Sequence, residues 1–149
     1  MDLQIKGKKA IMAGGSAGMG RATAERLAEA GVDLVITARR KERLEKAAEA
    51  ISAKYKVSVK PIVADSSKAE DRARLLQACP DPDILAITIK PPAPNGDFLK
   101  VTPDMWRESI DTALIGPIEL MRQYIPHMKN MGWGRIVNIA TFSAKNPMI

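Results

Sequence analysis

The glycine-rich segment at residues 13–20 constrains the fold of this chain more than any other feature. It reads Ala-Gly-Gly-Ser-Ala-Gly-Met-Gly and follows a short apolar run, Lys9–Ala13, whose length and glycine flank indicate a buried strand. Residues 19–30 then carry apolar or small residues at helical spacing and stop at Gly31, a residue favoured just past a helix end. The pattern predicts a strand, a tight turn and a helix in direct succession.

Strand and helix signals alternate along the rest of the chain, without an internal repeat. Asp33–Ala38 is rich in β-branched residues and predicts a second buried strand. Further strands are expected at residues 57–64, 84–89 and 135–140, and further helices at residues 41–54, 67–79 and 102–130. Five strands alternating with helices predict one α/β domain over residues 1–149, with a parallel sheet covered on both faces.

Proline and capping residues refine these boundaries. Pro61 falls inside the third strand, which places that strand near a sheet edge. Ser67 and Glu70 have the spacing of a capping box that opens the next helix. Thr102, which a proline follows, predicts the N-cap of the long helix, and Pro117 predicts a kink within it.

The glycines of the loop have distinct expected tasks. Gly14 permits a tight exit from the strand, Gly18 lets the backbone approach a pyrophosphate, and Gly20 lets the helix pack against the sheet. The first helical N–H groups and the helix dipole then face a diphosphate. A glycine-rich turn with a purely structural role is the alternative. The strand before and the helix after favour a dinucleotide site.

The end of the second strand indicates which dinucleotide is bound. A carboxylate there would bind both ribose hydroxyls of NAD, but the strand ends in Thr-Ala-Arg-Arg, with Arg39 and Arg40. Guanidinium groups suit the additional 2′-phosphate of NADP because they offer paired donors and a permanent charge. The alternative is that both arginines begin an exposed helix. We expect NADP(H) as the cofactor, ahead of NAD(H).

Composition excludes several other classes of function. The net charge is +6, but lysine and arginine alternate with acids, as at residues 39–46, which is typical of a solvated helix face. Aromatic residues are 4% of the chain, too few for a nucleic-acid stacking platform. One cysteine, Cys79, and one histidine, His127, indicate neither a disulfide nor a metal site. No apolar run is long enough for a membrane span, and we expect a cytoplasmic protein.

Four short motifs stand in order along the chain: the glycine spacing at residues 14–20, Asp65 after the third strand, and residues 83–85 and 134–139 at two strand openings. In this order they resemble the motifs of the short-chain dehydrogenase/reductase family. The stretch at residues 138–143 is most similar to a divergent branch labelled 3-oxoacyl carrier-protein reductase-like. In that family the acid at Asp65 lies against the adenine amino group.

The resemblance implies a doubly wound, Rossmann-like fold in three layers, with strands in the order 3-2-1-4-5 and the family's sixth and seventh strands beyond residue 149. It implies a small-molecule carbonyl or alcohol substrate, and a homo-oligomer formed through the helix before the fifth strand. Together with the glycine loop and the arginines, it assigns these cofactor-binding residues: Gly14, Ser16, Ala17, Gly18, Met19, Gly20, Arg39, Arg40, Asp65, Ser66, Thr88, Ile89 and Lys90.

The chain also departs from the family pattern. Ala13 replaces a threonine, and Ile-Thr-Ile-Lys at residues 87–90 replaces the motif Asn-Asn-Ala-Gly. The asparagine of the catalytic tetrad falls on Ala113, which cannot hold a relay water through its side chain. The tetrad serine falls on Thr141, and Ser143 is a second candidate for the hydroxyl that polarises a carbonyl oxygen.

The catalytic Tyr-x-x-x-Lys pair of the family is expected beyond Ile149, because neither Tyr55 nor Tyr124 has a lysine four residues later. We therefore expect these 149 residues to be inactive alone and to begin a longer oxidoreductase that interconverts a carbonyl and a secondary alcohol by hydride transfer. A non-catalytic dinucleotide-binding sensor or scaffold is the alternative function. A basic nucleic-acid partner is the third, and it predicts strongly salt-dependent binding.

Overall fold

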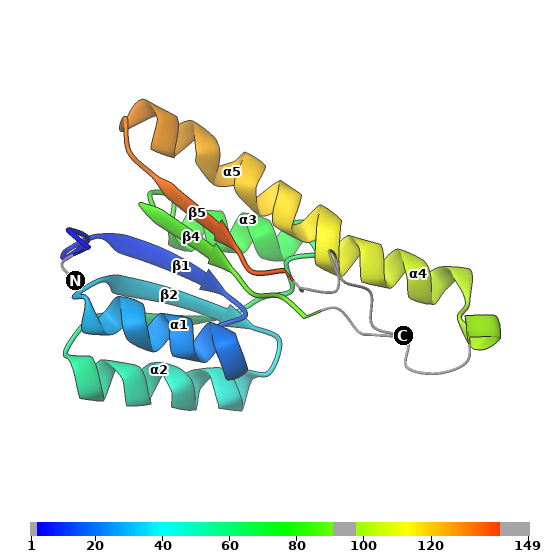
Figure 1. Ribbon diagram of the computed structural model, residues 1–149, viewed down its shortest axis with the longest axis horizontal. Helices are drawn as coiled ribbons and strands as arrows, with labels where there is room; N and C mark the ends of the chain where they lie inside the picture. The colour runs from blue at the N-terminus through cyan, green and yellow to red at the C-terminus, as the bar shows by residue number, and fades with distance from the viewer. Residues whose placement is uncertain (1–2, 91–97, 141–149) are drawn as a thin grey trace.

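The computed structural model describes residues 3–90 and 98–140 and has one five-stranded parallel sheet with helices on both faces (Figure 1). The strand order is β3-β2-β1-β4-β5, as predicted. The strands are β1 (Lys9–Ala13), β2 (Asp33–Ala38), β3 (Val59–Val63), β4 (Ile84–Ile87) and β5 (Arg135–Asn138). The third, fourth and fifth strands are shorter than the sequence pattern predicts. Pro61 lies in β3, which is an edge strand as expected.

Two helices cover one face of the sheet, α1 (Gly18–Glu29) and α2 (Lys41–Tyr55). Alternate residues of β1 and β2 point to this face, because successive side chains of a strand alternate sides. Met12 and Ile36, which face each other in the β1–β2 register, are both fully buried here against the two helices.

The opposite face is covered by α3 (Ala69–Ala78) and α5 (Gly116–Asn130). Ile11 of β1 lies between Val35 and Leu85 in the strand register, and all three belong to the buried cluster on this side. Cys79 is buried in the same cluster at the end of α3, and burial raises the pKa of its thiol. It packs as a small apolar residue, as its position at a helix end suggests.

The expected capping box at the start of α3 is wrong. The N-cap is Lys68, and no side chain accepts a hydrogen bond from the first turn. The Ser67 hydroxyl instead donates to Asp65 Oδ1 at 2.7 Å, and the Ser67 N–H donates to the same oxygen at 3.0 Å. The Ser67 hydroxyl therefore hydrogen-bonds to the Asp65 carboxylate instead of capping the helix.

The long predicted helix is divided into three segments, α4 (Pro103–Ile110), a π-helical turn (Asp111–Ile115) and α5. Thr102 caps α4 as predicted, because its Oγ1 accepts a hydrogen bond from the Met105 N–H at 3.3 Å. Pro117 has no N–H to donate to the carbonyl four residues earlier, so regular α-helical pairing fails just before it. The structure has a π-helical turn that ends at Ile115, two residues before the proline, and a kink of the helix axis there stays a prediction.

Within the described ranges, no helix is both long and apolar enough to span a membrane. The same residues contain no group of three or more potential metal-binding side chains of His, Cys, Asp or Glu.

Candidate cofactor-binding site

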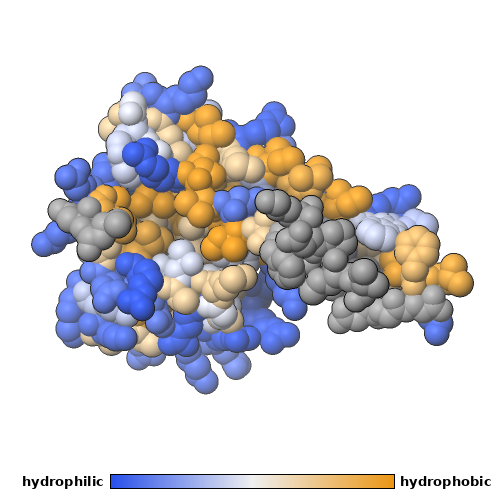
Figure 2. All heavy atoms as spheres, viewed as in Figure 1, coloured by the Kyte–Doolittle hydropathy of each residue, from blue (hydrophilic) through white to orange (hydrophobic). Residues whose placement is uncertain are grey.

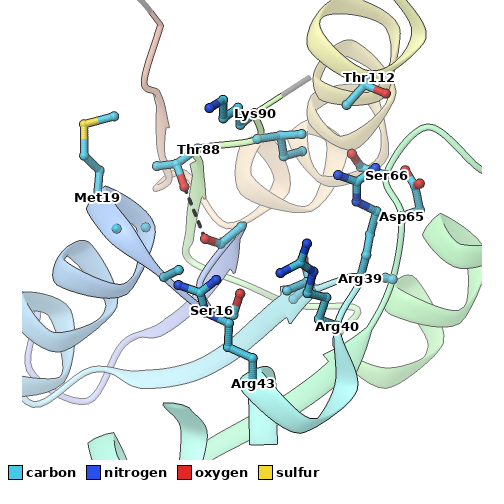
Figure 3. A pocket seen from close by; sticks show the side chains of 18 residues that line it. Ser16, Met19, Arg39, Arg40, Arg43, Asp65, Ser66, Thr88, Lys90 and Thr112 are labelled. Atoms are coloured by element: carbon cyan, nitrogen blue, oxygen red, sulfur yellow. Dashed lines mark hydrogen bonds between the residues drawn. The ribbon is translucent and has the colours of Figure 1, made fainter. Parts of the chain in front are cut away.

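A cleft of about 740 Å³ opens at the carboxyl ends of β1, β2 and β4. In the sheet, β1 has β2 on one side and β4 on the other, so the strand order reverses its direction at β1. Parallel α/β sheets bind ligands at this point, beyond the carboxyl ends of the strands. All the residues predicted to bind the cofactor line this cleft (Figure 3): Gly14, Ser16, Ala17, Gly18, Met19, Gly20, Arg39, Arg40, Asp65, Ser66, Thr88, Ile89 and Lys90. Their role in binding a cofactor stays a prediction.

The glycine loop has little room for side chains where it meets the sheet. Gly14 has a φ of +90°, and a Cβ there would lie 2.8 Å from the carbonyl oxygen of Thr88. A Cβ on Gly20 would lie 2.1 Å from the carbonyl oxygen of Gly14. Gly18, with a φ of +52°, faces open space instead. Two of the glycines therefore allow close packing, and the third leaves room for a ligand to approach the backbone.

The N-terminus of α1 opens into the same cleft. Its N-cap is Ala17, whose side chain accepts no hydrogen bond, and the first turn contains no acidic residue. The free N–H groups at the start of a helix, together with the helix dipole, attract an anion. This end of α1 has the features of a phosphate-binding helix terminus.

The cleft is strongly cationic. Its described lining contains three arginines and Lys90, whereas Asp65 is the one acid. Arg39 and Arg40 follow β2, as the sequence predicts. Arg43, in the first turn of α2, also lines the cleft and was not predicted. The charged run at residues 39–46 was interpreted as a solvated helix face, so the sequence analysis did not single out Arg43.

Asp65 is held in place by its neighbours. Its Oδ1 accepts both hydrogen bonds from Ser67, and its own N–H donates to Asp71 Oδ2 at 2.8 Å. That bond, followed by the ion pair with Arg74, lowers the pKa of Asp71. No described residue hydrogen-bonds to Asp65 Oδ2, which leaves this oxygen as an acceptor in the cleft.

The end of β4 forms the opposite wall. The Thr88 N–H donates to the carbonyl oxygen of Ala13 at 2.9 Å, which ties the strand end to the glycine loop. The Thr88 hydroxyl lies 3.4 and 3.5 Å from the carbonyl oxygens of Ala13 and Gly14, distances of weak hydrogen bonds. Lys90 is exposed and has no hydrogen bond or ion pair with the described residues.

Thr112, in the π-helical turn, also lines the cleft and was not predicted, as is true of Thr37, Ala38 and Ala64. Thr112 is 4% exposed and faces the cleft, whereas Ala113, where the family's asparagine falls, is exposed and does not line it. No local sequence signal predicts this shift, because the π-helical turn changes the register of the helix. The two predicted catalytic hydroxyls, Thr141 and Ser143, lie outside the described residues.

The chain is similar to known oxidoreductases along almost its whole length. It is 29% identical over 150 residues to the uncharacterized oxidoreductase YvaG of Bacillus subtilis, covering 99% of this chain and 56% of that protein. It is 29% identical over 144 residues to the 3-oxoacyl-[acyl-carrier-protein] reductase FabG of Aquifex aeolicus, covering 95% of this chain and 58% of that protein. The chain thus spans a little more than half the length of these relatives.

A similar solved structure is that of L-sorbose reductase from Gluconobacter frateurii in complex with NADPH and L-sorbose. Its TM-score is 0.92 at 28% identity, and the match covers 99% of this chain and 57% of that chain. The model of the short chain dehydrogenase family matches residues 8–149. The chain therefore belongs to the short-chain dehydrogenase family.

Proposed function

We propose that this chain binds NADP(H) and is part of an oxidoreductase that interconverts a carbonyl and a secondary alcohol. The observation that carries the proposal is a single cleft that joins the uncapped N-terminus of α1 to the arginines after β2. One end suits a diphosphate and the other suits a further phosphate. The solved complex of a similar reductase with NADPH supports this choice of cofactor.

The residues of the cleft fit such a cofactor. Gly18 leaves the backbone open to a diphosphate, and the residues after β2 that line the cleft are arginines, whereas Glu42 of the same segment does not line it. Arg39 and Arg40 would bind that phosphate, and the free Oδ2 of Asp65 would accept from the adenine amino group. The backbone at Thr88 and Ile89 would support the ribose on the nicotinamide side.

The cofactor, when bound, supplies the hydride, and the protein orients it and polarises the substrate. The hydroxyl of Thr141 or Ser143 would donate a hydrogen bond to the carbonyl oxygen as negative charge develops there. No tyrosine of these 149 residues is followed four positions later by a lysine, the pair that would donate the proton. These 149 residues alone are expected to show no ketone-dependent oxidation of NADPH.

A non-catalytic dinucleotide-binding protein is the second candidate. One observation favours it: the position of the family's catalytic asparagine carries Ala113, whose side chain has no polar atom and does not line the cleft. A longer form of the protein distinguishes the two functions. Turnover of NADPH with ketones supports the enzyme, whereas tight binding without turnover of any carbonyl compound supports the sensor.

Isothermal titration of the chain with NADPH and with NADH tests the cofactor. Charge-assisted hydrogen bonds contribute about 1.5–3 kcal/mol, so we expect NADPH to bind roughly 10- to 100-fold more tightly than NADH at low salt. The preference should fall as salt rises, because the arginines are exposed. Equal affinities would show that Arg39 and Arg40 do not bind the 2′-phosphate.

We further propose that the protein self-associates through α4 and α5. Trp106, Ile110, Leu114 and Ile118 follow one another at four-residue spacing and are all more than a third exposed. Figure 2 shows apolar side chains gathered over these helices. Light scattering of the chain and of Leu114→Asp tests this, and a monomer at all concentrations of the unmodified chain would contradict it.

A further inference from the structure

Arg43 lies in the first turn of α2 and lines the cofactor cleft together with Arg39 and Arg40. Side chains near the start of a helix lean toward its N-terminus. The N-terminus of α2 follows the end of β2, so the Arg43 side chain is directed at the cleft. Figure 3 shows it extending from α2 toward the glycine loop, where Ser16 lies.

The three cleft arginines differ from all the others in the chain. Each of the others has a carboxylate or carbonyl partner within the protein: Arg21, Arg26, Arg72, Arg74, Arg107, Arg122 and Arg135. The guanidinium groups of Arg39, Arg40 and Arg43 make no hydrogen bond, ion pair or ring contact with the described residues. Arginines on this protein are thus ordinarily paired, and the unpaired ones converge on one cleft.

The sequence of α2 excludes an acidic partner for Arg43 at helical spacing. Three and four residues before it stand Arg40 and Arg39, and three and four residues after it stand Lys46 and Ala47. On the same helix, Lys41 pairs with Glu45 four residues later at 3.9 Å. The surroundings of Arg43 therefore concentrate positive charge where an ordinary surface arginine would have an acid nearby.

We propose that Arg43 is a specificity-determining residue that binds the 2′-phosphate of NADP(H) together with Arg39 and Arg40. A phosphate monoester carries nearly two negative charges at pH 7 and three acceptor oxygens, more than one guanidinium can satisfy. Arg43 approaches from the helix side of the cleft, whereas the other two arginines approach from the strand end. This inference rests on the proposed NADP(H) function.

The test compares Arg43→Gln with Lys46→Gln by titration with NADPH and with NADH. Lys46 is exposed on the same helix but does not line the cleft, so its variant removes an equal charge elsewhere. Arg43→Gln should weaken NADPH binding at least tenfold and change NADH binding less than about twofold. Lys46→Gln should change both less than twofold. Arg43→Lys should restore part of the NADPH affinity, because it returns a single charge without the paired donors.

The outcomes separate the two proposals. If the unmodified chain binds no dinucleotide or does not prefer NADPH, the proposed function and the role of Arg43 both fail. A different result contradicts only the role of Arg43. In that result the unmodified chain prefers NADPH, Arg39→Gln removes the preference, and Arg43→Gln retains it. Equal weakening of NADPH and NADH by Arg43→Gln also contradicts specificity for the 2′-phosphate. Circular dichroism of each variant confirms that α2 remains folded.

Discussion

The part of the molecule from β1 to β3 and the part from β4 to β5 differ in how completely they are covered. In the first part, β1 and β2 are buried between helices on both faces, and few large apolar residues are exposed. In the second part, Val137 of β5 is 49% exposed and a row of apolar residues on α4 and α5 faces outward. The contrast is visible along the upper and right edge of Figure 2.

This difference separates the two tasks of the proposed function. The phosphate-binding features come from the first part, namely the glycine loop, the start of α1 and the arginines after β2. These features are positioned by a βαβ unit whose core on the side of α1 and α2 also includes Ile84 and Ala86 of β4. The wall formed by β4 and the π-helical turn belongs to the second part, whose outer surfaces remain uncovered among the described residues. Cofactor binding is therefore expected to be the more robust property of this chain.

The largest effect is expected at Gly20, within the first part. A Cβ there would lie 2.1 Å from the Gly14 carbonyl oxygen and 2.4 Å from Thr88 Oγ1, so the backbone of the glycine loop would have to shift. Gly20→Ala should lower the free energy of unfolding by about 3 kcal/mol and abolish NADPH binding. Urea unfolding measures the first effect.

The matched control is Gly18→Ala. A Cβ at this position would have no atom within 4 Å, and the only unfavourable feature is the backbone φ of +52°. It should cost about 1 kcal/mol of stability. Its Cβ should still weaken dinucleotide binding, because it would occupy the space in front of the helix N-terminus. A loss of stability equal to that of Gly20→Ala would contradict the packing role of Gly20.

Valine-to-alanine substitutions compare the two parts directly. Val35 of β2 is 6% exposed, whereas Val137 of β5 is 49% exposed. Val35→Ala should cost about 2 kcal/mol, because it removes two buried methyl groups and leaves a cavity. Val137→Ala should cost about 0.5 kcal/mol or less. Equal losses in thermal unfolding would show that β5 is covered in solution, as self-association through the second part would produce.

Local signals predicted the first part better than the second. β1 and β2 are mainly apolar segments that lie close to glycines or arginines, so their bounds follow from the sequence alone. The predicted capping box is wrong because the Ser67 hydroxyl hydrogen-bonds to the carboxylate of Asp65 and not to the helix end. The sequence pattern of a capping box does not consider a residue at the position of Asp65. The π-helical turn and Thr112 depend on where pairing fails before Pro117, which a fixed helical period cannot represent.

The lining of the cleft was predicted where sequence position alone decides which residues reach it, while their roles stay predictions. Each glycine of the loop has a place between β1 and α1, and each arginine after β2 lies at the strand end. Arg43 was missed because the charged run at residues 39–46 has the composition of a solvated helix face. Its direction becomes clear only when α2 is placed on the sheet with its first turn at the cleft.

A smaller effect is expected at Asp71, which connects α3 to the cleft by accepting from the Asp65 N–H. Its lowered pKa means that the folded state favours the carboxylate. The resulting stability is present above the unfolded pKa, near 4, and is lost as pH falls through the folded pKa. Asp71→Asn should therefore cost about 1 kcal/mol at pH 7, and the difference should shrink steadily below about pH 4. A difference that is constant with pH would contradict this role.

The smallest effect should be a gain, at Tyr124 in the second part. Tyr124 is completely buried, and its hydroxyl has no hydrogen-bond partner among the described residues. The side chain of the adjacent Gln123 donates instead to the carbonyl oxygen of Arg72 at 3.1 Å. Burial raises the pKa of Tyr124 above its usual value, which favours the neutral hydroxyl.

Tyr124→Phe removes this desolvated hydroxyl and retains the ring, and should change the free energy of unfolding by between zero and about 1 kcal/mol, in favour of the folded state. Leu120→Ala in the same buried cluster is the contrasting variant and should cost about 3 kcal/mol, because it leaves a cavity. A loss of stability in Tyr124→Phe would show that the hydroxyl has a partner in solution. The core of the second part would then depend on a polar contact that the core of β1 and β2 does not need.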